Sequence, residues 1–125
     1  MTPTHVRMMT AYGGWMNGRM LDLCGTRSDA ERKRGLGAFF KSVHGTFDHL
    51  IYGDLAWTGR LTESWLAETM SLPRWVLVTH MFNHATHHRG QLTTLMKQLG
   101  VEPGVTDLPW LPALYDGTVL RATQM

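Results

Sequence analysis

Residues 72–100 read LPRWVLVTHMFNHATHHRGQLTTLMKQLG and carry a strong helical pattern. Proline is tolerated at the first position of a helix, as Pro73 would be, because the N–H that it lacks has no partner there. Gly100 is a typical helix end, and Pro103 follows it closely. The sequence therefore predicts a helix over residues 73–99. Four of the seven histidines of the chain fall inside it, between residues 80 and 88.

The first helix is predicted over about residues 4–24. Apolar, aromatic and other residues recur there at helical spacing, namely Met8, Tyr12, Trp15, Met16, Arg19 and Leu23. Three glycines, Gly13, Gly14 and Gly18, oppose the helix, since glycine costs about 1 kcal/mol relative to alanine in a helix interior. Gly25 suits the C-terminal cap of this helix.

The second helix is predicted over about residues 30–60. The stretch SDAE, from Ser28 to Glu31, has the form of a capping box that opens a helix. At about 100° per residue, one narrow apolar stripe then contains Phe39, Val43, Leu50, Trp57 and Leu61.

The remaining segments contain no strand signal. Residues 62–72 suit a short helix or a structured turn, and the tail 100–125 has three prolines and no sustained period. We expect the tail to wrap over the helices, anchored by Trp110, Leu111 and Leu114. The sequence thus predicts one all-α domain over residues 1–125, an antiparallel helical bundle with three long helices.

Composition excludes several classes of function. The formal net charge of +2 and the absence of a basic-aromatic face argue against nucleic-acid binding. No segment has the roughly 18 apolar residues that span a membrane, and no apolar signal-peptide core stands near the start. Cys24 is the only cysteine, so no intrachain disulfide can form. We expect a cytoplasmic protein.

The histidines of the last predicted helix divide into two groups on a helical wheel. His84 and His88 lie side by side at the centre of the apolar face, close to Leu77 and Leu95. His80 and His87 lie toward one edge of that face. Gln91 points the same way as the central pair.

Two buried imidazoles one turn apart need partners, because an unpaired buried polar group costs roughly 1–3 kcal/mol. A metal ion bound by His84 and His88 is one solution, with the i, i+4 spacing of helical zinc motifs. The alternative is a hydrogen-bonded pair in the core. No glutamate follows His84, so the HExxH protease motif is absent.

A third ligand would come from the second predicted helix, which carries His44 and His49. In an antiparallel pair, residues equally far from the connection lie at one level. His49 matches the level of His84 within a turn, whereas His44 lies about 7 Å further along and nearer to His88. Asp54 falls inside the apolar stripe and needs a buried partner, so a direct ligand and a supporting role are both open.

Three stretches resemble the DinB family: AYGGWMNGRML at residues 11–21, HGTFDHLIYGDLAWTGRL at 44–61, and HMFNHATHHRGQLTTLMKQLG at 80–100. The last, with its HxxHHRGQ motif, is the most specific. The resemblance implies a four-helix bundle of the DinB/YfiT type, commonly dimeric, with a divalent metal held by three histidines. Carried over, these ligands are His49, His84 and His88, with His87 as a neighbour. The region of the family's third helix is short in this chain, at about residues 62–74, so pairing of two copies into a homodimer is expected.

The resemblance also implies candidate reactions, since family members include thiol-dependent transferases and a mycothiol-dependent isomerase. We expect zinc or nickel as the metal, and thiol S-transfer with a low-molecular-weight thiol as cosubstrate. The alternatives are a metal-dependent hydrolase and a non-catalytic dimer with a structural metal or none. The catalytic residues are not identified, and the candidates beside the metal are Asp54, His87 and Gln91.

Overall fold

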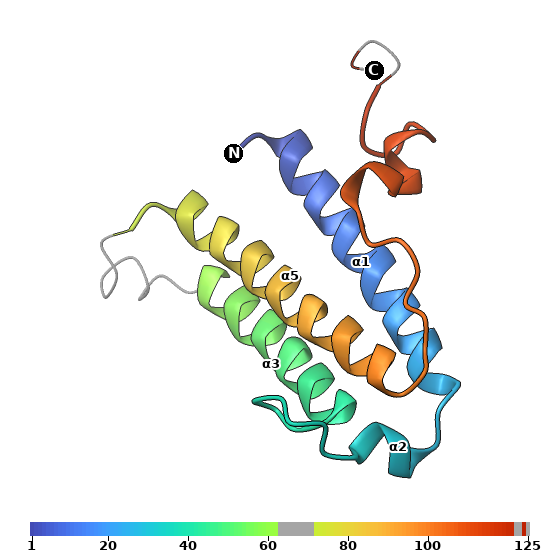
Figure 1. Cartoon of the computed structure of the whole chain (residues 1–125). Coiled ribbons are helices and arrows are strands. Elements are labelled where there is room, and N and C mark those ends of the chain that lie inside the picture. The colour runs from blue at the N-terminus through green and yellow to red at the C-terminus, as the bar shows by residue number, and fades with distance from the viewer. Residues whose placement is uncertain (63–71, 122–123, 125) are drawn as a thin grey trace.

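The chain folds as three long helices and one short one, followed by a tail with two single-turn helices (Figure 1). The structure is a computed structural model that describes residues 1–62, 72–121 and 124. The elements are α1 (Pro3–Gly25), α2 (Asp29–Lys33), α3 (Val43–Thr62), α5 (Arg74–Gln98), η1 (Leu108–Trp110) and η2 (Pro112–Leu114). No strand occurs among the described residues, so the predicted all-α class is confirmed.

Helix α5 lies between the other two long helices (Figure 1). Helix α3 runs antiparallel to α5, as predicted, and α1 runs in the same direction as α5. The tail turns back along α1 toward the N-terminus, where the Tyr12 hydroxyl donates a hydrogen bond to the Thr106 carbonyl at 2.6 Å. The described helices include none that is long and apolar enough to cross a membrane.

The core lies where the C-terminal halves of α1 and α5 meet the start of α3. Its buried residues are Tyr12, Met16, Met20, Val43, Phe47, Leu92, Leu95, Met96, Leu99, Val101 and Leu111. Helix α1 runs unbroken through its three glycines, because burial of its methionine face outweighs their low helix propensity. This core fixes the register of α3 against α5, and so positions the histidines.

The predicted single helix over residues 30–60 is wrong, because the chain forms α2, a loop and then α3. The capping box at Ser28 and Glu31 is present, but it opens a helix of only five residues. Helix α2 ends at Lys33, where Arg34 is already extended, and Gly37 then adopts a φ of +80° within the loop. The Ser42 hydroxyl accepts a hydrogen bond from the Gly45 N–H at 3.0 Å where α3 begins. The predicted apolar stripe crosses this break, so its residues do not share one buried face: Val43 is buried, but Phe39 is 84% exposed.

Two of the three predicted anchors of the tail are confirmed, and the third, Trp110, is wrong. Leu111 is 2% exposed and belongs to the core, and Leu114 packs against it, whereas Trp110 is 61% exposed. Consecutive residues of a 3₁₀ turn point about 120° apart, so burying Leu111 turns Trp110 outward. A short helix and a structured turn are the alternatives predicted for residues 62–72, and this segment lies almost wholly outside the described residues.

Replacing Tyr12 with phenylalanine should destabilise the protein by about 1 kcal/mol, because the bond that ties the tail to α1 is lost. Thermal unfolding monitored by circular dichroism measures the change. Tyr115 is the matched control, since it is 64% exposed and its hydroxyl bonds within the tail itself, to the Pro109 carbonyl. An equal loss in Tyr115→Phe would contradict the assigned role of Tyr12.

Candidate metal centre

Three histidine side chains from two helices converge at one point. His49 comes from α3, and His84 and His88 come from α5. The Nε2 atom of His88 lies 3.1 Å from the Nε2 atom of His49 and 3.1 Å from that of His84. All three ligand atoms lie within 4.8 Å of one another. The three histidines predicted as ligands are therefore brought together, while their binding of a metal stays a prediction.

The helix pair creates this arrangement with little help from loops. His84 and His88 are one turn apart on α5, and the antiparallel α3 brings His49 to the same level. Gly53, one turn after His49, leaves room for the His84 ring: a Cβ atom there would lie 2.9 Å from His84 Cε1. Any side chain at this position would push against the imidazole.

The His88 ring is oriented by a residue of its own helix. Its Nδ1 atom lies 2.7 Å from the Gln91 side-chain oxygen, to which it donates a hydrogen bond. In the neutral imidazole, Nε2 then carries a lone pair and no proton. A single lone pair cannot accept good hydrogen bonds from both other rings at once, whereas a cation at the centre satisfies all three nitrogens.

The spacing of the nitrogens suits the metals that histidine prefers. With metal–nitrogen distances near 2.0–2.1 Å, ligand atoms lie about 3.3–3.4 Å apart in a tetrahedral site and about 3.0 Å apart on one face of an octahedral site. The observed 3.1 Å falls between these values. These two separations are compatible with a divalent metal between the rings and do not distinguish one such metal from another.

The surroundings of His84 and His88 favour the neutral imidazole, which is the form that can bind a metal. Burial lowers the pKa of His84, and the neighbouring histidines lower it further. Burial also lowers the pKa of His88, while its bond to Gln91 acts in the opposite direction. His88 is buried and the other two rings are partly exposed, so a small molecule can approach from their side.

Phe40 forms one wall of the cluster and was not anticipated. Its ring stacks on His49 with 4.0 Å between centroids and meets the edge of His88 at 5.5 Å. Phe40 lies in the loop between α2 and α3, where a Cβ atom on Gly45 would overlap the Phe40 carbonyl oxygen. The glycine-containing stretch RGLG at residues 34–37 was the available signal that this loop exists.

The other candidates lie around the cluster. The ring of His80 packs on Trp57 at 4.7 Å, and the exposed His87 lies 5.0 Å from the His88 ring. His44 is on the surface and pairs with Asp48. Asp54 is partly buried, which raises its pKa, and the charge of Arg89 acts against that rise. Among the described residues, no carboxylate joins the three histidines as a potential ligand.

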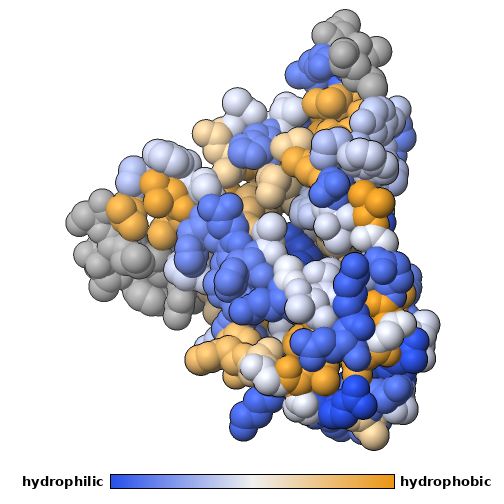
Figure 2. All heavy atoms as spheres, in the orientation of Figure 1, coloured by the Kyte–Doolittle hydropathy of each residue, from blue (hydrophilic) through white to orange (hydrophobic). Residues whose placement is uncertain are grey.

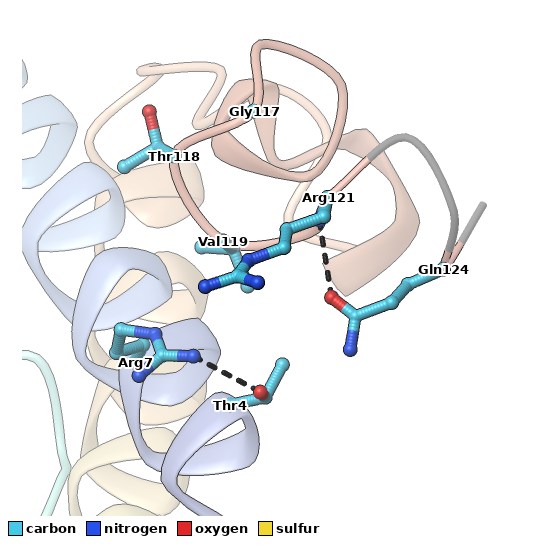
Figure 3. A pocket seen from close by; sticks show the side chains of 7 residues that line it. All are labelled: Thr4, Arg7, Gly117, Thr118, Val119, Arg121 and Gln124. Carbon is cyan, nitrogen blue, oxygen red and sulfur yellow. Dashed lines mark hydrogen bonds between the residues drawn. The ribbon is translucent and has the colours of Figure 1, made fainter.

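A separate hollow of about 520 Å³ lies at the opposite end of α1 from the core (Figure 3). Arg7 and Arg121 both point toward it, from α1 and from the tail. Both arginines are exposed, and Arg7 donates to the Thr4 hydroxyl at 3.0 Å. This hollow shares no residue with the histidine cluster.

Replacing Gln91 with leucine should weaken metal binding about 10- to 100-fold, the usual effect of removing the hydrogen-bond partner of a histidine ligand. Competition with a chromogenic chelator measures the affinity. Gln98, at the C-terminal end of the same helix, provides the control variant Gln98→Leu. Unchanged affinity in Gln91→Leu would show that the bond to His88 does not support a ligand.

Comparison with known proteins adds one finding. The family model described as DinB family matches residues 1–71 and 67–118, which together cover most of the chain. No curated protein and no solved structure matches the chain significantly.

Proposed function

This chain belongs to the DinB family, and we propose that it binds one divalent metal ion through His49, His84 and His88. The observation that carries the proposal is the convergence of three Nε2 atoms from two helices, with the Nδ1 atom of His88 already bonded to Gln91. Zinc and nickel are the proposed metals, because neutral imidazole suits both.

We further propose that the site serves transfer of a thiol sulfur to an electrophilic carbon. A bound divalent metal would supply Lewis acidity that lowers the pKa of a thiol or a water molecule beside it. The protein lowers the pKa values of His84 and His88, fixes His88 through Gln91, and covers one side of His49 with Phe40. The partly exposed rings of His49 and His84 leave an approach for a small thiol.

Thiol transfer is favoured over hydrolysis because of the groups around the cluster. Hydrolysis by water needs a general base beside the reacting atoms. Within the described part of the chain, no carboxylate belongs to the cluster, and the charge that acts on Asp54 is that of Arg89. A thiol carries its own nucleophilic sulfur, so thiol transfer needs fewer catalytic groups from the protein.

Incubation of the metal-loaded protein with a small thiol and chlorodinitrobenzene tests the proposal. In this reaction a carbon–sulfur bond forms, the carbon–chlorine bond breaks, and chloride and the thiol proton leave. We expect the S-conjugate to form faster with the intact protein than with His84→Ala. Hydrolysis of an activated ester without thiol would instead favour the hydrolase. If neither reaction occurs over a panel of thiols and electrophiles, the result would favour a non-catalytic protein with a structural metal.

Metal affinity should stay nearly constant from pH 8 to pH 7 and fall about tenfold or more between pH 6 and pH 5. Protons compete with the metal for the imidazoles. Because the pKa values of His84 and His88 are lowered, these rings stay neutral below the usual histidine value near 6.5. Chelator competition at each pH measures the profile. A fall that begins above pH 7 would contradict it.

We also propose that two copies of the chain pair through α3. Three apolar residues on this helix, Ile51, Tyr52 and Leu55, are 44%, 68% and 70% exposed. Figure 2 shows one face of the molecule, on which apolar side chains form several separate patches beside hydrophilic ones. Sedimentation velocity should give twice the chain mass, and Leu55→Glu should give a monomer. A monomeric wild-type protein at micromolar concentration would refute the pairing.

A further inference from the structure

Arg89 is a buried cation at the contact between α5 and α1. Its side chain is only 5% exposed, and burial lowers the pKa of its guanidinium. Arginine nevertheless stays charged in proteins. A buried charge is destabilising unless an opposite charge or a full set of hydrogen bonds compensates it.

The neighbours of Arg89 compensate its charge only in part. One Nη atom donates to the Asn17 side-chain oxygen and the other to the Thr86 hydroxyl, each at a long 3.3 Å. The Nε–H is buried and has no partner among the described residues. The face of the Tyr12 ring lies 5.4 Å away and adds a weak cation–π contact.

A carboxylate partner is missing as well. Among the described residues, no carboxylate oxygen lies within 4.0 Å of an Arg89 nitrogen. Asp54 acts on Arg89 electrostatically from a greater distance. Within the described part of the chain, the guanidinium is thus a buried donor group without a directly paired carboxylate.

Space for a partner exists beside it. A pocket of about 100 Å³ is lined by Arg89, Tyr12, Met16, Thr86, Gly90, Thr93 and Thr106. Thr86 and Gly90 are exposed, so the pocket opens to solvent on their side. The Tyr12 hydroxyl already donates to Thr106, and the Thr93 hydroxyl already donates to Gly90. Among the described residues that line the pocket, Arg89 carries the only positive charge.

We propose that this pocket binds a carboxylate group, held by the guanidinium of Arg89. A carboxylate has two oxygens that accept hydrogen bonds from guanidinium N–H groups, and it would bring a negative charge next to the buried cation. The volume admits the carboxylate end of a molecule or a free ion of the size of formate. The inference rests on the burial of Arg89 and does not depend on the metal.

Thermal unfolding in sodium formate tests the proposal, with sodium chloride at equal ionic strength as the reference. With a dissociation constant of about 10 mM, 100 mM formate should raise the melting temperature by about 3–6 °C relative to chloride. The shift should persist in His84→Ala, which separates this pocket from the histidine cluster, and disappear in Arg89→Met. A melting temperature that is the same in both salts, or higher in chloride, would overturn the proposal.

Two further variants guard against misfolding and against binding elsewhere. A Cβ atom on Gly90 meets no atom within 4 Å, so Gly90→Leu should fold, obstruct the pocket and abolish the formate shift while keeping Arg89. Gly18→Leu on α1 is its control, since a Cβ there also meets open space and Gly18 lies outside the pocket. Arg7→Met should keep the shift. Loss of the shift in Arg7→Met would place the anion in the exposed hollow of Figure 3 and overturn the assignment.

Discussion

Replacing His84 with alanine should lower the affinity for zinc or nickel on the order of 1,000-fold. Structural zinc sites have binding free energies of roughly 12 kcal/mol, so one of three protein ligands accounts for about 4 kcal/mol. The Nε2 atoms of His84 and His88 lie 3.1 Å apart. Without the His84 ring, only His49 and His88 would remain as ligands. Metal content after dialysis and chelator competition measure the loss.

His87 is the matched control for this experiment. It lies on the same helix and next to His88, but it is exposed and stands outside the cluster. His87→Ala should retain the metal. If it loses as much metal as His84→Ala, the assignment of ligands is wrong. If His84→Ala instead unfolds or dissociates the protein, the metal is structural, and the non-catalytic alternative gains support.

The elements of the site that follow local periodicity could be predicted from sequence. His84 and His88 share a face because they are four residues apart, and Gln91 follows His88 at the spacing that permits a hydrogen bond between them. His49 lies at the level of His84 and His88 because α3 and α5 are antiparallel and closely packed. The break between α2 and α3 does not affect the level of His49, because His49 lies after the break, within α3.

What depends on loops and on close approach between helices could not be predicted. Phe40 reaches His49 only because the chain leaves the helical path before Val43, and a continuous apolar stripe conceals that break. Periodicity also does not reveal that α1 helps to bury the guanidinium of Arg89, which pairs with no carboxylate among the described residues. Such features are set by tertiary packing, which periodicity along one helix does not encode.

Gly53 is a position where two helices approach closely beside the histidine cluster, and Gly53→Val should weaken the proposed metal binding by about 100-fold or more. A Cβ atom there would lie 2.9 Å from Cε1 and 3.3 Å from Nδ1 of His84, so the ring must move. The ring is the end of a side chain, and valine has a better helix propensity than glycine by a few tenths of a kcal/mol. The helix should therefore persist while the ligand leaves the cluster.

The matched control for Gly53→Val is Gly59→Val on the same helix, where a Cβ atom meets no atom within 4 Å. Chelator competition should show wild-type affinity in Gly59→Val, and circular dichroism should show the same helix content in both variants. Equal affinities in the two variants would mean that His84 is not a ligand or that its ring binds from another position. Loss of helix content in Gly53→Val alone would show that the His84 ring cannot move aside. The substitution would then act on the fold and not on the position of one ligand.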